Sequence, residues 1–170
     1  MSGVLTLRNH QRELRVNLPV LRQITRALLR DYVQRDYLEL GIHLLSDADM
    51  VRLNETFLRH QGSTDVITFD YGEPAQPELL CGEIFICIEE AIAQARRFHT
   101  TWQSELIRYL VHGLLHLCGY DDRTAVMRRA MKAEENRLLA LLTRRFSFTE
   151  LALKRVRESR RRQGRVESRL

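Results

Sequence analysis

Cysteine, proline and long apolar runs are all scarce in this 170-residue chain. Its three cysteines, Cys81, Cys87 and Cys118, form no C-x-x-C pair, which argues against a disulfide framework and against a thiolate zinc cluster. No apolar run approaches the ~20 residues of a membrane-spanning helix, and the charged N-terminal region lacks the apolar core of a secretory signal. With 44% apolar residues and only three prolines and eight glycines, the chain is expected to fold as one compact cytoplasmic domain with reduced cysteines.

Positive charge is unevenly distributed along the chain. The 27 Lys and Arg residues exceed the 22 Asp and Glu residues, which gives a formal net charge of +5 and a pI of about 9.5. Residues 154–170 carry a net charge of +6, which leaves residues 1–153 at −1. This charge, with almost no large apolar side chains, predicts a flexible Arg-rich tail at residues 154–170 after a folded domain of residues 1–153. Such a tail could bind RNA phosphates with little base preference, or simply be a solvated extension.

Helical and strand-like segments alternate irregularly in residues 1–153. Apolar residues at helical spacing predict helices, and runs of β-branched and aromatic residues predict strands. The expected helices cover residues 19–33, 46–58, 89–98, 100–117 and 124–142, and the expected strands cover residues 4–8, 37–45, 64–71 and 83–88. Thr100, followed by Gln103, is expected to cap its helix. Strands and helices mixed without a strict βαβ rhythm indicate an α+β fold, a single domain with a small mixed β-sheet packed by helices.

The helix expected at residues 100–117 carries the residue pattern that indicates a chemical function. His112 and His116 are four residues apart and therefore lie on one helix face, where two imidazoles can share a metal ion. Gly119 is typical of a helix end, after which Asp122 can return to the same ion, giving H-x3-H-x5-D. Three protein ligands and an open position are typical of catalytic zinc, which makes hydroxide available at neutral pH. We therefore predict a hydrolytic zinc site at the end of a central helix.

This pattern also has competing interpretations. The two histidines could be coincidental, and the acidic residues could be ordinary turn residues; for Asp121 we favour a turn or supporting role. A zinc peptidase needs a glutamate directly after the first histidine as general base, and that position is Gly113. Two histidines and one carboxylate also match the non-haem iron triad, for which a helix-borne pair is less typical.

The segment HGLLHLCGYDD, residues 112–122, resembles the signature of the YbeY family of rRNA-maturation endoribonucleases, whose usual form is H-G-x-L-H-L-x-G-Y-D-H. Other segments agree with the family in the same order. They are LNETF at residues 53–57, STDVITF at 63–69, GEIFI at 82–86 and MKAEENRLL at 131–139. A joint match of this kind is far more specific than any one motif.

The resemblance implies a single α+β domain that uses a zinc site to cleave single-stranded RNA. It also implies work in 16S rRNA 3′-end maturation and ribosome quality control, with the 16S rRNA precursor and the ribosome or its small subunit as partners. His112 and His116 fall on the first two metal-binding histidines of the family, and Asp122 falls on the third, where the family commonly has histidine. Because aspartate lowers the net charge of the site, we expect Zn²⁺ with a less acidic bound water, or a relaxed preference among divalent metals.

Upstream of the signature, the family often places an arginine four residues after its motif asparagine, and Leu58 occupies that position here. Arg59 and His60 follow it. We expect Arg59 to neutralise phosphate charge and His60 to donate a proton, unless the pair is an exposed loop without a role. Asp65 is expected to fix the loop-to-strand geometry, and Glu135 to be a surface group or a support for the ligands.

The leading function is therefore a zinc-dependent endoribonuclease specific for single-stranded RNA. The main alternative is a ribosome-assembly factor without catalysis, in which zinc holds the fold. A zinc-dependent peptidase is a weaker alternative.

Overall fold

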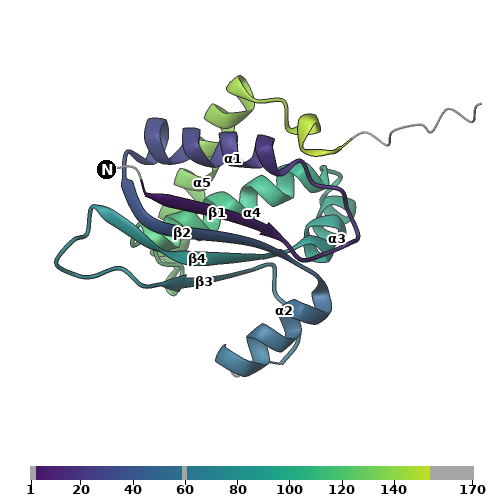
Figure 1. Cartoon of the computed structure of the whole chain (residues 1–170), viewed down its shortest axis with the longest axis horizontal. Helices are drawn as coiled ribbons and strands as arrows, with labels where there is room; N and C mark the ends of the chain where they lie inside the picture. The colour runs from purple at the N-terminus through teal and green to yellow at the C-terminus, as the bar shows by residue number, and fades with distance from the viewer. Residues whose placement is uncertain (1–2, 59–60, 154–170) are drawn as a thin grey trace, which may run out of the picture.

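The computed structural model describes residues 3–58 and 61–153 (Figure 1). Its strands are β1 (Val4–Asn9), β2 (Asp36–Leu45), β3 (Val66–Asp70) and β4 (Leu79–Cys87). Its α-helices are α1 (Leu18–Ala27), α2 (Asp47–Leu53), α3 (Ile88–Phe98), α4 (Trp102–Leu117) and α5 (Ala125–Arg145). Two π-helical segments, Leu28–Val33 and Asn54–Leu58, extend α1 and α2, and a short 3-10 helix, Phe148–Leu151, follows α5. The predicted tail at residues 154–170 lies outside the described residues, as do Arg59 and His60.

The strands form one mixed sheet in the order β1-β2-β4-β3. β1, β2 and β4 run parallel, whereas β3 pairs with β4 in the antiparallel direction. Burial alternates along β4, so that Leu80, Ile84 and Ile86 are buried on one face while the residues between them point to the other. The predicted α+β fold with a small mixed sheet packed by helices is confirmed.

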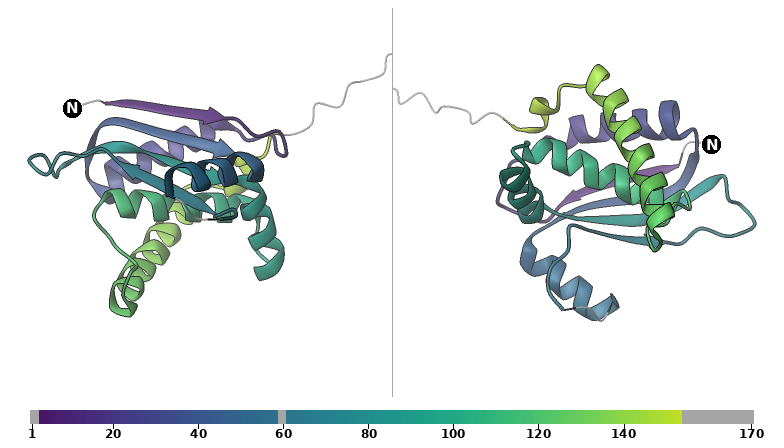
Figure 2. Two further views of the ribbon diagram at one scale, coloured as in Figure 1. Left: turned by 90° about the horizontal axis from the view of Figure 1, so that it is seen from below. Right: turned by 180° about the vertical axis from the view of Figure 1, so that it is seen from behind.

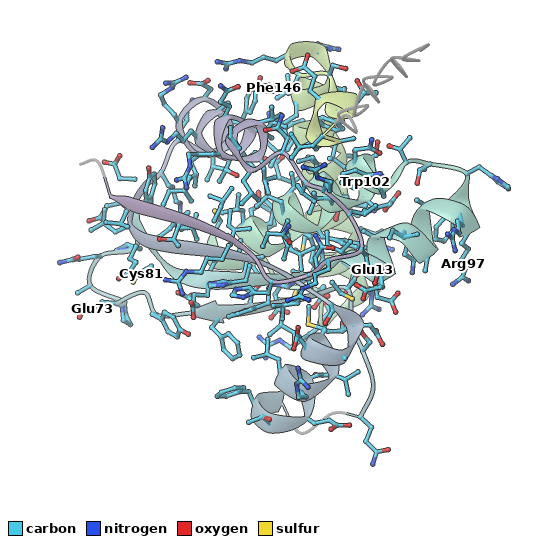
Figure 3. The ribbon with its side chains drawn as sticks, turned by 45° about the vertical axis from the view of Figure 1, so that its right-hand side comes forward. Glu13, Glu73, Cys81, Arg97, Trp102 and Phe146 are labelled. Carbon is cyan, nitrogen blue, oxygen red and sulfur yellow. The ribbon has the colours of Figure 1, made fainter. Side chains whose placement is uncertain are left out.

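Helices cover the two faces of this sheet unequally. α1 and α4 lie over one face and α5 crosses α4, whereas α2 lies on the opposite side of the sheet (Figures 1 and 2). Trp102 at the start of α4 and Phe146 after α5 pack against the main core (Figure 3). Met50 of α2 belongs to a separate, smaller apolar cluster with Ile67 and Cys87. Among the described residues, no helix combines the length and the apolar character needed to cross a bilayer.

Two glycines let α4 approach the sheet closely. A Cβ at Gly113 would lie 2.7 Å from Cγ2 of Ile84 in β4, too close for any side chain. A Cβ at Gly82 would meet the backbone carbonyl of Phe69 and the side chain of Leu117. The C-terminal half of α4, which carries both histidines, is therefore seated directly on β4.

The start of α4 differs by one residue from the prediction. Thr101, not Thr100, is the N-cap, and its Oγ1 accepts a hydrogen bond from the backbone N–H of Ser104 at 3.2 Å. Thr100 instead donates its hydroxyl to Glu105 Oε1 at 2.6 Å. The two threonines thus satisfy different polar groups at the same helix end.

Candidate metal centre

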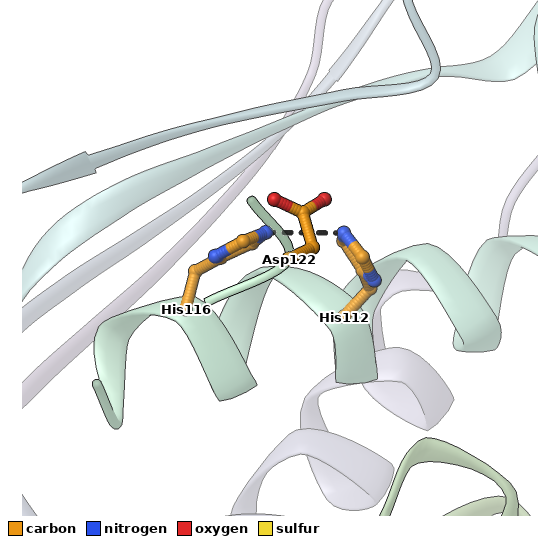
Figure 4. A group of neighbouring side chains, drawn as sticks. All are labelled: His112, His116 and Asp122. Carbon is orange, nitrogen blue, oxygen red and sulfur yellow. Dashed lines mark hydrogen bonds between the residues drawn. The ribbon is translucent and has the colours of Figure 1, made fainter. Parts of the chain in front are cut away.

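Two of the three predicted metal ligands, His112 and His116, lie on one side of α4. The apolar residues of α4, among them Leu110 and Leu114, face the core, and this leaves His112 and His116 half-buried one turn apart. Their Nε2 atoms face each other at 3.1 Å, and the rings meet edge to face with centroids 4.7 Å apart (Figure 4).

The loop after α4 brings a carboxylate to the histidines. Gly119 has a φ of +88°, in the left-handed region that favours glycine, and it ends the helix there. Asp122 is exposed, and one oxygen of its carboxylate lies within 4.8 Å of a ring nitrogen of both histidines (Figure 4). Asp121 accepts hydrogen bonds from the backbone N–H of Asp122 at 2.7 Å and of Arg123 at 3.1 Å. Asp121 therefore shapes the turn that presents Asp122, which is the role predicted for it.

Each histidine is oriented by an acceptor at its other ring nitrogen. His112 Nδ1 lies 3.2 Å from Glu135 Oε2, and His116 Nδ1 lies 3.1 Å from the backbone oxygen of Tyr120. Because carboxylate and carbonyl oxygens only accept, each Nδ1 is placed to donate its hydrogen to its acceptor, which leaves each Nε2 directed at the other histidine. The two Nε2 atoms therefore point into the same space, where one metal ion could be bound by both.

The spacing of these nitrogens also suits zinc. Two Zn–N bonds of ~2.0–2.1 Å at a tetrahedral angle separate their nitrogens by ~3.3 Å. The side chains of His112, His116 and Asp122 supply two nitrogens and an oxygen, a donor set that catalytic zinc sites use. The residues present therefore fit a divalent metal of this kind.

Glu135 of α5 lies behind His112, with its side chain only 5% exposed. Its Oε1 accepts hydrogen bonds from Arg108 Nη1 at 2.5 Å and from Lys132 Nζ at 2.6 Å. Burial alone would raise the pKa of Glu135, but the hydrogen bonds from its three partners outweigh burial and lower the pKa to about 2. Glu135 is thus a buried carboxylate placed to accept from Nδ1 of His112, so it is not the surface group that was one of the two expectations, and its position fits the supporting role.

Two cavities border the cluster. A cavity of about 370 Å³ lies against α4 and α5 and is bordered by His112 and Asp122, together with several cationic side chains. A second cavity, of about 390 Å³, lies against the edge strand β3 and is bordered by all three cluster residues and by residues 64–68. Asp65 borders both cavities. An extended substrate can therefore approach the cluster from two sides.

The structure brings together the three residues predicted to hold a metal, His112, His116 and Asp122. The roles predicted for Arg59 and His60 stay predictions, because neither residue is among those described. Sequence reasoning missed Arg108 and Lys132 as neighbours of the site. The spacing of Arg108, four residues before His112 on the same helix, was a usable signal, whereas Lys132 gave none of comparable strength.

Comparisons with known proteins agree on one family. A family model described as Endoribonuclease YbeY matches residues 6–143. The Endoribonuclease YbeY of Parabacteroides distasonis is 40% identical over 97 residues, which are 57% of this chain and 66% of that protein. The Endoribonuclease YbeY of Cytophaga hutchinsonii is 41% identical over 104 residues, which are 61% of this chain and 71% of that protein. The solution structure of TM1509 from Thermotoga maritima has a similar fold, with a TM-score of 0.60, 22% identity, and coverage of 82% of this chain and 89% of that one.

Proposed function

The chain belongs to the YbeY endoribonuclease family, and from that premise we propose that it is a zinc-dependent endoribonuclease specific for single-stranded RNA. Family membership supports the endoribonuclease role. The proposed setting is the cytoplasm, in 16S rRNA 3′-end maturation and ribosome quality control, with the 16S rRNA precursor and the small ribosomal subunit as partners. The resemblance of residues 112–122 to the family signature supports this finer assignment.

One observation carries the metal-dependent mechanism: the Nε2 atoms of His112 and His116 face each other at 3.1 Å beside the carboxylate of Asp122. A zinc ion held by His112, His116 and Asp122 would supply a Lewis acid that acidifies water and polarises a phosphodiester. Glu135 and the carbonyl of Tyr120 would accept the Nδ1 hydrogens of the two histidines, so that both rings are held with Nε2 toward the metal. Arg59 stays the predicted cation for charge that develops on the phosphate.

The position after the first histidine weighs against a peptidase. In the peptidase motif a glutamate stands there as general base. Here the residue is Gly113, and any side chain at this position would be directed at Ile84 in β4, on the sheet side of α4. A glutamate there would be directed into the core, so the fold itself does not accommodate that base.

Cleavage and metal content measured in parallel test this proposal. Wild type, His112→Asn and His99→Asn would be incubated with the single-stranded 3′ region of precursor 16S rRNA, and bound metal would be measured by mass spectrometry. His99 is an exposed histidine outside the cluster with a φ of +54°, a conformation that asparagine tolerates, so it is the matched control. We expect His112→Asn to lose both cleavage and metal, and His99→Asn to keep both.

Other outcomes would point to other functions. Metal-loaded wild type that binds the RNA without cutting it would support the assembly-factor alternative, and cleavage of casein would support a peptidase. Products that end in a 2′,3′-cyclic phosphate would assign the attack to the 2′-hydroxyl and not to water.

The third ligand has a test of its own. Asp122→Ala removes the carboxylate but leaves Asp121, whose oxygen shapes the turn, in place. We expect metal content to fall in this variant. Unchanged metal content would contradict the assignment of Asp122 as a ligand.

A further inference from the structure

The cavity of about 370 Å³ between α4 and α5 has an apolar floor and a rim of charged side chains. Tyr109 and Met131 form the floor and are 5% and 2% exposed. Arg108, Arg128 and Lys132 stand around it. The volume lies near the lower end of the ~300–1,000 Å³ range of small-ligand pockets, and an apolar interior with a few convergent polar groups is typical of them.

The rim carries charges of both signs: the cations Arg108 and Lys132 stand beside Glu135, whereas Asp122 belongs to the His112–His116–Asp122 cluster and Asp65 also borders the second cavity. The side chains of Arg108 and Lys132 are 32% and 56% exposed, whereas the carboxylate that they share, Glu135, is 5% exposed. A guanidinium has five N–H donors and an ammonium has three, so both cations retain donors beyond those that Glu135 accepts. An anionic group at the side of the cavity formed by Arg108 and Lys132 would therefore meet donors before it met the buried carboxylate of Glu135.

The third cation at the cavity, Arg128, contacts the loop after α4. Arg128 Nη1 donates to the backbone oxygen of Asp122 at 2.9 Å, so it holds the loop that carries the third predicted metal ligand. His112 and Asp122 thus belong both to the wall of the cavity and to the His112–His116–Asp122 cluster. A ligand in the cavity would lie directly beside the place where the reaction occurs.

We propose that this cavity is a nucleotide subsite: it binds one nucleotide of the RNA beside the scissile phosphodiester, with the phosphate on Lys132 and Arg108 and the base against Tyr109 and Met131. This inference rests on the proposed function and names how its substrate is held. A base can enter such a pocket only when it is unpaired and splayed out of the stack, because paired bases of an RNA helix are not accessible to it. The subsite therefore gives a physical reason for a preference for single strands.

The subsite can be tested without RNA cleavage. The full chain would be labelled at its methionine methyl groups and titrated by NMR with adenosine 5′-monophosphate, adenosine or ribose 5-phosphate, each to about 10 mM. Met131 borders the cavity, whereas Met50 lies in the separate cluster under α2, so the Met50 methyl is an internal control. We expect the nucleotide to shift the Met131 signal and leave that of Met50 unchanged, and we expect both fragments to bind more weakly.

A matched pair of variants tests the cation. Lys132→Gln should weaken binding of the nucleotide by about 3- to 10-fold and leave binding of adenosine unchanged, because only the phosphate contact is lost. Arg137→Gln is the control, since Arg137 lies on the same helix with 52% exposure and pairs with Glu134. No shift at Met131, equal binding of ribose 5-phosphate and the nucleotide, or equal effects of the two variants would each overturn the subsite. Failure of the chain to cut RNA would instead overturn the proposed function, since the NMR titration reports on the cavity alone.

Discussion

Neutralising Glu135 should weaken both the fold and the metal site. Lowering the pKa of this carboxyl from its ordinary 4.5 to about 2 corresponds to ~3 kcal/mol of stabilisation of the charged form at neutral pH. Glu135→Gln keeps the size of the side chain and one acceptor, while Arg108 and Lys132 can turn to solvent. We therefore expect the free energy of unfolding of the metal-free protein to fall by about 1–3 kcal/mol, and its Tm by about 2–10 °C.

The effect on metal binding follows from the orientation of His112. A carboxylate that accepts the Nδ1 proton of a ligand histidine raises the basicity of the other nitrogen, and loss of such a partner typically costs 10- to 100-fold in metal affinity. Zinc affinity would be measured by competition with a chelating dye. Glu134→Gln is the matched control, because Glu134 is the neighbouring residue on α5 and forms its ion pair with Arg137.

The lowered pKa of Glu135 also fixes the direction in which its contribution to stability changes with pH. Because the folded-state pKa of Glu135 is lowered, its contribution is fully present above about pH 4.5 and is lost as the pH falls toward about 2. The stability difference between wild type and Glu135→Gln should therefore be constant from pH 7 to about 5 in urea titrations and shrink below that. If Glu135→Gln bound zinc like wild type and unfolded like Glu134→Gln, the buried carboxylate would not be a working part of the site.

Three further changes have expected outcomes. Gly113→Glu completes the peptidase motif in sequence, but it should give no casein cleavage and lower the free energy of unfolding by about 2 kcal/mol or more, because its side chain meets Ile84. Burial lowers the pKa of His43 below its ordinary 6.5, and this effect outweighs the opposite effect of Glu83. The free energy of unfolding should therefore fall as the pH drops from about 6.5 to 5. His43→Gln should make this fall less steep in urea titrations, and an equally steep fall would contradict the prediction. Deletion of residues 154–170 should weaken RNA binding at low salt and spare zinc content, and loss of zinc on truncation would count against separate roles for domain and tail.

The local elements of this fold could be predicted because their signals are local. The strand predicted at residues 83–88 and the helix predicted at 100–117 correspond to β4 and α4, since alternation and helical spacing are read within a few residues. The predicted cap of α4 differs by one residue from the structure, because Thr100 with Gln103 matches the capping-box pattern in sequence, whereas Thr101 is the cap that forms. The structure separates them, since the hydroxyl of Thr100 is already engaged by Glu105.

The candidate ligands could be predicted from local sequence, whereas the contacts around them could not. His112 and His116 are brought together by the helical period alone, and Gly119 with Asp121 shapes the short loop to Asp122, so the cluster is encoded within one segment of sequence. The contact between Glu135 and Arg108 joins residues 27 positions apart and exists only because α5 crosses α4.

This difference limits what the signature can predict about function. Arg108 lies before the H-x3-H-x5-D segment and Lys132 lies after it, so a chain could keep every ligand of the motif and lose both cations. Such a chain would keep the three candidate metal ligands but lack the phosphate contacts of the proposed nucleotide subsite, and its Glu135 would lose two hydrogen-bond donors. We therefore expect metal binding and phosphate binding to be separable. Lys132→Gln, which leaves Arg108 on Glu135, is the variant in which zinc content should stay unchanged while nucleotide binding weakens.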